Sequence, residues 1–164
     1  MKKAIITGLF SILLLGGISA LKGQEAKPYN PDANAREQIA GAVSRAAENG
    51  KHVFLMIGGN WCPWCLRFHR FVNENSELLK LMHDNYEWEM INYSKENKNL
   101  DILAELGYPQ RFGFPVFVIL DGKGNRLHTQ NSAYLEKDKS YDAEKVKGFL
   151  MHWSPAALDP TSYR

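Results

Sequence analysis

The sequence predicts an α/β domain in which helices flank a small central mixed β-sheet. Two runs of uninterrupted apolar residues, 53–57 and 116–120, are typical of strands buried on both faces. Segments with the apolar spacing of helices separate and flank these runs, and the turn-rich residues 121–125 predict an antiparallel return of the chain. We expect the two apolar strands to be neighbours at the centre of the sheet.

An extra helix is expected before the first of these strands, at residues 31–49. Asp32 is a plausible N-cap residue, and Gly50 follows the last position of the helix, where glycine is favoured. Apolar residues recur every four positions along it: Ile39, Val43 and Ala47. This spacing predicts one buried face.

The remaining elements are expected to alternate between helix and strand. Those before the second apolar run are a helix at residues 62–73, a second helical piece capped by Ser76, a strand at 86–93 and a helix at 99–106. Those after it are a returning strand at 126–130 and a final helix at 142–153, which Pro155 stops. The loop at 108–114 precedes the second apolar strand.

Composition excludes several classes of protein. The chain has 164 residues, of which 45% are hydrophobic and 23% charged, as in an ordinary globular domain rather than a disordered, collagen-like or multi-span membrane protein. Two cysteines are too few for a disulfide-dense scaffold. The formal net charge of +2 is matched by Lys2 and Lys3 alone, so the rest of the chain offers no basic surface for nucleic acid.

The first residues have the layout of a secretory signal peptide. Lys2 and Lys3 precede an apolar run at residues 4–18, and small residues end the segment at Ala20. We expect residues 1–20 to be removed, with cleavage after Gly23 as the second choice and an uncleaved membrane anchor as the alternative. A polar linker is expected at residues 24–30, one domain at 31–154 and a C-terminal tail at 155–164. A cleaved leader predicts a periplasmic or secreted protein, in a compartment where disulfides persist.

Both cysteines lie in one short motif, Trp61-Cys62-Pro63-Trp64-Cys65, which follows a predicted buried strand and opens a predicted helix. The first thiol at a helix N-terminus lies at the positive end of the helix dipole, which favours its thiolate. Proline suits the first helical position because it has no N–H to lose there. The motif therefore predicts a nucleophile, Cys62, and a resolving thiol one turn deeper, Cys65.

On these residues, the chain resembles the thioredoxin superfamily, in particular exported thioredoxin-like proteins with a W-C-x-W-C motif. The resemblance covers about residues 51–153 and includes Gly113-Phe114-Pro115 before an apolar strand, followed by a hairpin and a helix. It implies a thioredoxin-like fold with a cis Pro115 that faces the cysteine pair. It also implies that the backbone of Phe114 is a docking edge for an extended substrate segment.

Further contacts with substrate are expected from the aromatic residues and the proline of the motif. We expect Trp61, Pro63 and Trp64 to contact substrate, with Trp61 part packing and part contact surface and Trp64 the more exposed tryptophan. The loop at 108–112 lies beside the presumed docking edge and is expected to shape substrate choice.

One position departs from the family. Thioredoxins carry a buried Asp six residues before the first cysteine, where it assists proton transfer at the resolving thiol, and this chain has Met56 there. Glu87 or Glu89 could substitute for that carboxylate, water could do so, or resolution could be slower.

Two other interpretations of the cysteine pair are an alternative to a redox role. Cys62, Cys65 and possibly His69 could bind a metal or deliver copper, although a fourth ligand is not visible in the sequence. Alternatively, the pair is a structural disulfide in a binding module. His69 is expected to be a partly exposed helix residue, and we expect no resident metal.

The resulting hypothesis is an exported, single-domain thiol–disulfide oxidoreductase that acts on protein disulfides or dithiols through Cys62 and Cys65. It needs no dissociable cofactor, and a monomer is the default state. A reductase outside the cytosol would need an electron donor, for which a membrane thiol relay is the expected partner. The sequence leaves open whether the protein reduces, oxidises or isomerises its substrates.

Overall fold

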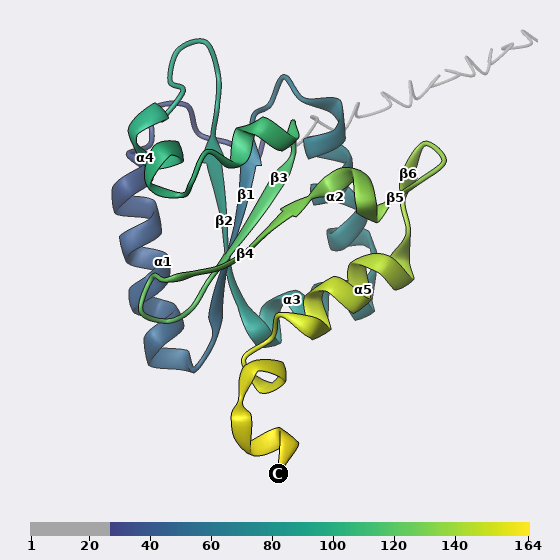
Figure 1. Cartoon of the computed structure of the whole chain (residues 1–164). Coiled ribbons are helices and arrows are strands. Elements are labelled where there is room, and N and C mark those ends of the chain that lie inside the picture. The colour runs from purple at the N-terminus through teal and green to yellow at the C-terminus, as the bar shows by residue number, and fades with distance from the viewer. Residues whose placement is uncertain (1–26) are drawn as a thin grey trace, which may run out of the picture.

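The structure is a computed structural model that describes residues 27–164; the predicted signal peptide lies outside the described residues. Its main sheet has four strands in the order β2-β1-β3-β4 (Figure 1). The strands are β1 (His52–Gly58), β2 (Tyr86–Asn92), β3 (Val116–Leu120) and β4 (Arg126–Asn131). β1 pairs with β2 in parallel and with β3 antiparallel, and β3 pairs antiparallel with β4, so the sheet is mixed as predicted.

Five α-helices within residues 27–164 cover the two faces of this sheet. They are α1 (Ala35–Asn49), α2 (Pro63–Glu74), α3 (Ser76–Asn85), α4 (Leu100–Glu105) and α5 (Ala143–His152). Figure 1 shows α1 and α4 on one side of the sheet and α2, α3 and α5 on the other. None of the helices in residues 27–164 is long and apolar enough to cross a membrane.

The two apolar runs are confirmed as adjacent central strands. All seven residues of β1 and all five of β3 are buried, and Ile57 pairs with Val116 at the end of β1 that leads into the cysteine motif. Alternate residues of β1 enter separate cores. Val53 packs toward α1 and α4, whereas Phe54 packs toward α2, α3 and α5.

Helix capping agrees with the predictions at some ends and not at others. Gly50 ends α1 in the left-handed conformation with φ 63°, as predicted. The N-cap of α1 is Asn34 rather than Asp32, because the Asn34 side chain accepts the N–H groups of Arg36 and Glu37. Similarly, Asn75 rather than Ser76 caps α3 and accepts two backbone N–H groups.

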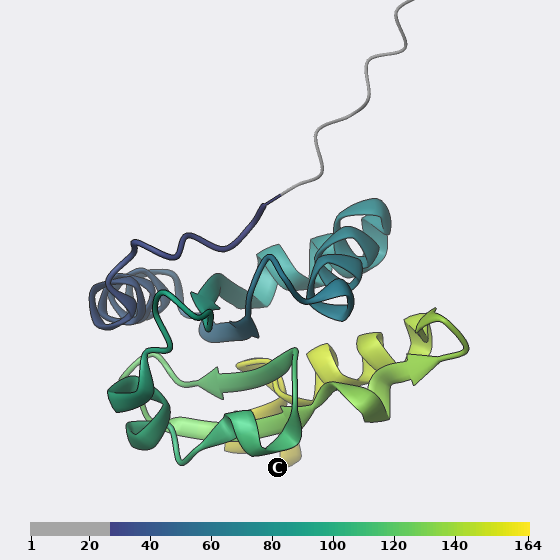
Figure 2. The same ribbon diagram turned by 90° about the horizontal axis from the view of Figure 1, so that it is seen from above.

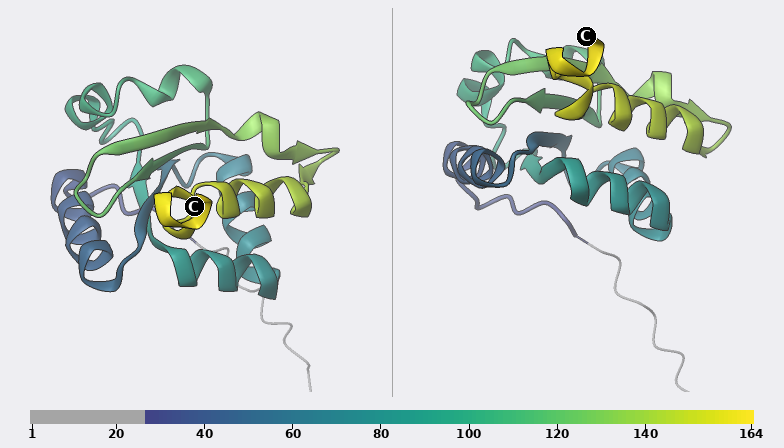
Figure 3. Two further views of the ribbon diagram at one scale, coloured as in Figure 1. Left: turned by 60° about the horizontal axis from the view of Figure 1, so that its bottom comes forward. Right: turned by 90° about the horizontal axis from the view of Figure 1, so that it is seen from below.

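The C-terminal part contains the predicted hairpin strand and helix together with elements that the sequence did not predict. A 3₁₀ helix at Ser132–Leu135 leads into a second, two-stranded sheet made of β5 (Glu136–Lys137) and β6 (Ser140–Tyr141). Figure 2 shows this hairpin projecting beyond α5. Short 3₁₀ helices at Ala156–Leu158 and Pro160–Tyr163 follow α5 and form the C-terminal end of the chain (Figure 3).

One residue of the segment predicted as a linker, 24–30, is buried in the domain. Tyr29 is only 2% exposed and joins the core beneath α2, α3 and α5. Asn97 Nδ2 donates a hydrogen bond to the carbonyl of Pro31 at 3.1 Å, which holds the following turn against the domain. We call residues 27–34 the N-terminal strap. The predicted linker therefore includes one buried aromatic side chain, which its polar neighbours did not reveal in the sequence.

Candidate active site

The cysteine motif connects the end of β1 to the start of α2, as the sequence predicts. Cys62 is the N-cap residue of α2, Pro63 occupies its first turn, and the two cysteines form a disulfide with their Cα atoms 5.2 Å apart. Cys62 is 3% exposed and Cys65 is fully buried. The outer sulfur is therefore the one closer to solvent, and the inner one faces the core.

Backbone groups at the helix start stabilise negative charge on the outer sulfur. The N–H of Cys65 donates a hydrogen bond to Cys62 Sγ at 3.1 Å. This contact adds to the positive end of the α2 dipole, and both favour a thiolate over a thiol at Cys62 once the disulfide is reduced. Such a thiolate is the nucleophile that thiol–disulfide exchange requires.

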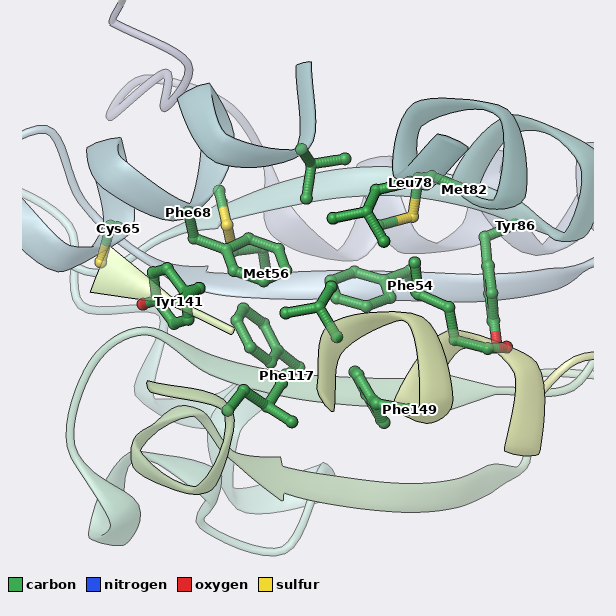
Figure 4. Close-up of a cluster of buried hydrophobic side chains, with 14 of the residues drawn as sticks. Phe54, Met56, Cys65, Phe68, Leu78, Met82, Tyr86, Phe117, Tyr141 and Phe149 are labelled. Carbon is green, nitrogen blue, oxygen red and sulfur yellow. The ribbon is translucent and has the colours of Figure 1, made fainter. Parts of the chain in front are cut away.

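The inner sulfur lies at one end of an aromatic core. Figure 4 shows Cys65 beside Tyr141, with Phe68 and Met56 next along the cluster and Tyr86 at the far end. The Tyr141 hydroxyl donates to the carbonyl of Trp64 at 3.2 Å. Among residues 27–164, no carboxyl group is buried, so the resolving sulfur has no buried acid for a neighbour.

Glu87 and Glu89, suggested above as substitutes for the missing Asp, lie on the wrong face of the sheet. In the register of β1 and β2 they pair with Val53 and Leu55, whose side chains enter the core under α1. Both carboxylates bond Arg45 of α1, at 3.0 Å and 2.6 Å. The cysteines belong to the opposite core, and this part of the hypothesis is therefore wrong.

Trp61 and Trp64 exchange the exposures that we predicted. Trp61 is 54% exposed, while Trp64 is only partly exposed and packs edge-on against Tyr141 at 5.5 Å between ring centroids. Because Trp64 is held within the cluster, the surface beside the cysteines is offered by Trp61. The prediction that Trp64 is the more exposed tryptophan is wrong.

Trp61 stands between two surface hollows. Its Nε1 donates to the carbonyl of Tyr93 at 2.6 Å, which fixes the indole. A hollow of about 500 Å³ on one side is lined by Trp61 and by residues 93–96 and Lys98. Another of about 360 Å³ is lined by Asn60, Trp61, Pro63, Leu66, Arg67 and Arg70. Pro63, which is exposed, lines the second hollow together with Trp61.

The Phe114–Pro115 peptide bond is cis. Pro115 is buried and immediately precedes β3, whose first residue pairs with Ile57 of β1, so the bond lies at the same end of the sheet as the cysteine motif. The Phe114 ring packs against the rings of Trp61 and Tyr93, with 5.6 Å and 4.6 Å between ring centroids. The loop before Pro115 contains a 3₁₀ helix at Pro109–Phe112. Two aromatic residues of this loop, Tyr108 and Phe112, are exposed.

His69 is half-buried and its ring lies 5.4 Å from that of Trp88. Burial lowers the pKa of His69 below its ordinary value. In residues 27–164, no three His, Cys, Asp or Glu side chains are grouped so that they could hold a metal ion. Among the described residues, Cys62, Cys65 and His69 are therefore not gathered into a three-ligand site.

Three neighbours of the motif were not found from the sequence. Tyr29 reaches the cysteines from the N-terminal strap, Asn60 binds that strap, and Tyr93 holds Trp61. No periodicity marks any of them. Asn60 alone carried a signal, since it adjoins the motif.

Comparison with known proteins agrees with this architecture. The family model described as Thioredoxin-like matches residues 34–122. A disulphide isomerase from Xylella fastidiosa Temecula1 has a TM-score of 0.67 and 22% identity, covering 76% of this chain and 94% of that one. A structure described as DsbH Oxidoreductase has a TM-score of 0.51 and 20% identity, covering 67% of this chain and 77% of that one.

No curated protein matches the sequence significantly. The two structures are too distant in sequence to indicate more than the fold, which is the α/β fold with a central mixed sheet that the sequence predicts. The family model spans more than half of the chain and includes both cysteines. The chain therefore belongs to the thioredoxin-like family.

Proposed function

We propose that this protein is an exported thiol–disulfide oxidoreductase that acts on protein substrates through a redox-active pair, Cys62 and Cys65. The observation that carries the proposal is the disulfide at the N-terminus of α2, where Cys62 Sγ accepts a backbone N–H and lies beside the exposed Trp61. A purely structural disulfide would not need its outer sulfur to be stabilised as a thiolate next to an exposed aromatic surface.

The reaction transfers two electrons and two protons. In the reducing direction, the Cys62 thiolate attacks one sulfur of a substrate disulfide, and the other substrate sulfur leaves and takes up a proton. The Cys65 thiol then loses its proton and attacks Cys62 Sγ. The bond between Cys62 and the substrate breaks, the Cys62–Cys65 disulfide forms, and the second substrate sulfur leaves as a thiol. The reverse sequence oxidises a substrate dithiol.

Substrate binding is assigned to the surface around Trp61. The indole, the Phe114 ring and Pro63 present apolar area beside the outer sulfur, and the hollows flanking Trp61 provide room for side chains of an extended segment. The cis peptide bond before Pro115 lies at this end of the sheet, and we assign the Phe114 backbone as the docking edge for that segment.

The proposals about export and about interaction partners are based on the sequence. Residues 1–20 have the three parts of a secretory leader, so we assign the protein to the periplasm or the extracellular space. Working as a reductase there, it would need electrons from another thiol protein, and a membrane thiol relay is the class of donor proposed. The electrons reside in the two sulfurs, so no further cofactor is required.

Substrate trapping tests the proposal. A Cys65→Ser variant is expected to accumulate mixed disulfides between Cys62 and substrate proteins, which run as high-mass bands on non-reducing gels and disappear with dithiothreitol. The matched Cys62→Ser variant should form few or none, because its remaining thiol is buried. Equal trapping by both variants, or by neither, would contradict the assignment of Cys62 as the nucleophile.

A further inference from the structure

The resolving sulfur is in a position where ionisation is unfavourable. Cys65 is fully buried at the end of an apolar cluster, and desolvation raises the pKa of a buried thiol. To attack the mixed disulfide, however, Cys65 must lose its proton. Residues 27–164 contain no buried carboxylate that could stabilise the thiolate at this sulfur.

Tyr29 is the buried polar group that borders it. Its hydroxyl has no hydrogen-bond partner, and the residue is only 2% exposed. Tyr29 and both cysteines belong to the same buried cluster. An unpaired buried hydroxyl is unfavourable, so its presence calls for an explanation.

The Tyr29 hydroxyl and the Cys65 sulfur both lie next to Gly58. A Cβ atom built on Gly58 would overlap with Cys65 Sγ and lie 3.0 Å from the Tyr29 hydroxyl, and these are the two residues nearest to it. The backbone at Gly58 does not have a positive φ, so the glycine is required by space rather than by conformation. The Tyr29 hydroxyl and the inner sulfur therefore both border Gly58, the last residue of β1.

The strap is held so that this contact is fixed. The backbone N–H of Tyr29 donates to Asn60 Oδ1 at 3.1 Å, and Asn60 Nδ2 donates to the Tyr29 carbonyl at 2.7 Å. Asn60 lies two residues before Cys62, so a residue that adjoins the motif positions the tyrosine. Both backbone polar groups of Tyr29 are paired, and only the hydroxyl is left for the sulfur.

We infer that Tyr29 is a positioning residue for the second step of the reaction, and that its hydroxyl donates a hydrogen bond to the Cys65 thiolate. This inference rests on the proposed function. The proton that Cys65 loses goes to solvent or to the departing substrate thiolate, while Tyr29 keeps its own. Its hydroxyl is unpaired in the disulfide form and gains an acceptor when Cys65 ionises.

Tyr29 acts as a hydrogen-bond donor and not as a base. Burial, together with the nearby Tyr141, raises the pKa of Tyr29 well above its ordinary value, so the phenol stays protonated. The titratable group that interacts with Tyr29 at this end of the cluster is Tyr141, whose hydroxyl already donates to the Trp64 carbonyl. Both tyrosines are neutral across the working range, and neither supplies a charge to the sulfur.

The test compares Tyr29→Phe with Tyr86→Phe in the full-length protein. Tyr86 is an equally buried tyrosine, but its hydroxyl donates to the Leu150 carbonyl at the far end of the cluster (Figure 4). Each change is combined with Cys62→Ser, so that Cys65 is the only thiol. The pKa of Cys65 is then read from the ultraviolet absorbance of its thiolate, after subtraction of a protein without either cysteine.

Removing the Tyr29 hydroxyl is expected to raise the pKa of Cys65 by about one to two units, the effect of one hydrogen bond to a charged group. Tyr86→Phe should leave that pKa in place. No shift in Tyr29→Phe, or the same shift in both variants, would overturn the inference. This readout needs no turnover, so a protein that shows the shift but fails to trap substrates would contradict the proposed function alone.

A second measurement covers the case in which the thiolate cannot be titrated before the protein unfolds. With both cysteines present, oxidised Tyr29→Phe should be at least as stable as the unchanged protein, because it loses an unpaired buried group. At alkaline pH, reduced Tyr29→Phe should be less stable than the unchanged reduced protein. Equal losses in both redox states would mean that the hydroxyl has a structural role only.

Discussion

Asn60 and Tyr29 are joined by a reciprocal pair of hydrogen bonds, in which each residue donates once and accepts once, at 3.1 Å and 2.7 Å. The pair ties the beginning of the described chain to the residue that precedes Trp61. The N-terminal strap is thereby part of the active-site wall, and Tyr29, far from the cysteines in sequence, lies in the same buried cluster as they do.

Removing the Asn60 side chain should release the strap. We expect Asn60→Ala to lower the free energy of unfolding of the oxidised protein by about 2 kcal/mol, since two neutral hydrogen bonds are lost. Denaturant unfolding measures this. The control is Asn73→Ala, which removes one hydrogen bond to the His69 carbonyl on exposed α2 surface and should have a smaller effect. Equal effects would mean that the strap is not held by Asn60.

The carboxylates of β2 should not matter for resolution. Glu87→Gln combined with Glu89→Gln leaves the face that contains the cysteines untouched, so the rate of substrate reduction should stay within about twofold of the original. Stability should fall by no more than about 1 kcal/mol per pair, because the Arg45 side chain is 48% exposed. A severalfold loss of the resolving rate in a folded double variant would restore these residues as proton-transfer groups.

The two tryptophans of the motif should separate binding from stability. Trp61→Ala is expected to weaken the apparent affinity for protein substrates severalfold, with the unfolding midpoint changed little, because Trp61 is 54% exposed. Trp64→Ala should instead lower the free energy of unfolding by about 2–4 kcal/mol, since Trp64 packs on the core. KM and unfolding curves for both variants check this assignment, and the opposite pattern would contradict it.

His69 should make stability depend on pH. Burial lowers the pKa of His69 in the folded protein below the ordinary 6.5 of the unfolded chain. Between the folded-state pKa and 6.5, the unfolded chain therefore binds more protons than the folded one. The free energy of unfolding should therefore decrease as the pH falls below 6.5. His69→Gln should remove this part of the decrease, whereas a change at the exposed His152 should not. Unfolding curves measured at several pH values between neutral and mildly acidic test it, and an unchanged slope in His69→Gln would refute it.

Features encoded by neighbouring residues could be predicted from the sequence. β1 and β3 are runs in which every residue is buried, so no choice of face was needed to recognise them. The start of α2 follows from a cysteine N-cap and a proline in the first turn. Gly50 marked the end of α1, because its left-handed backbone suits glycine.

The features that were missed depend on segments that meet only in the fold. The side of the sheet to which Glu87 points is set by pairing of β2 with β1, and the partly buried pattern of β2 did not reveal it. The exposures of Trp61 and Trp64 depend on Tyr93 and Tyr141, which come from other elements. Tyr29 carries no pattern at all, and only its position beside Cys65 gives it a role.

The central claim is that Cys62 and Cys65 exchange electrons with other thiols, and the equilibrium reduction potential of the pair tests it most directly. In thiol–disulfide buffers, we expect a reversible two-electron transition, reported by the fluorescence of Trp61 and Trp64 and absent in Cys62→Ser. A potential of about −270 mV would indicate a reductant, whereas a potential of about −120 mV would indicate an oxidant. If the pair shows no reversible transition, or stays oxidised under conditions that reduce thioredoxins, the redox account is contradicted.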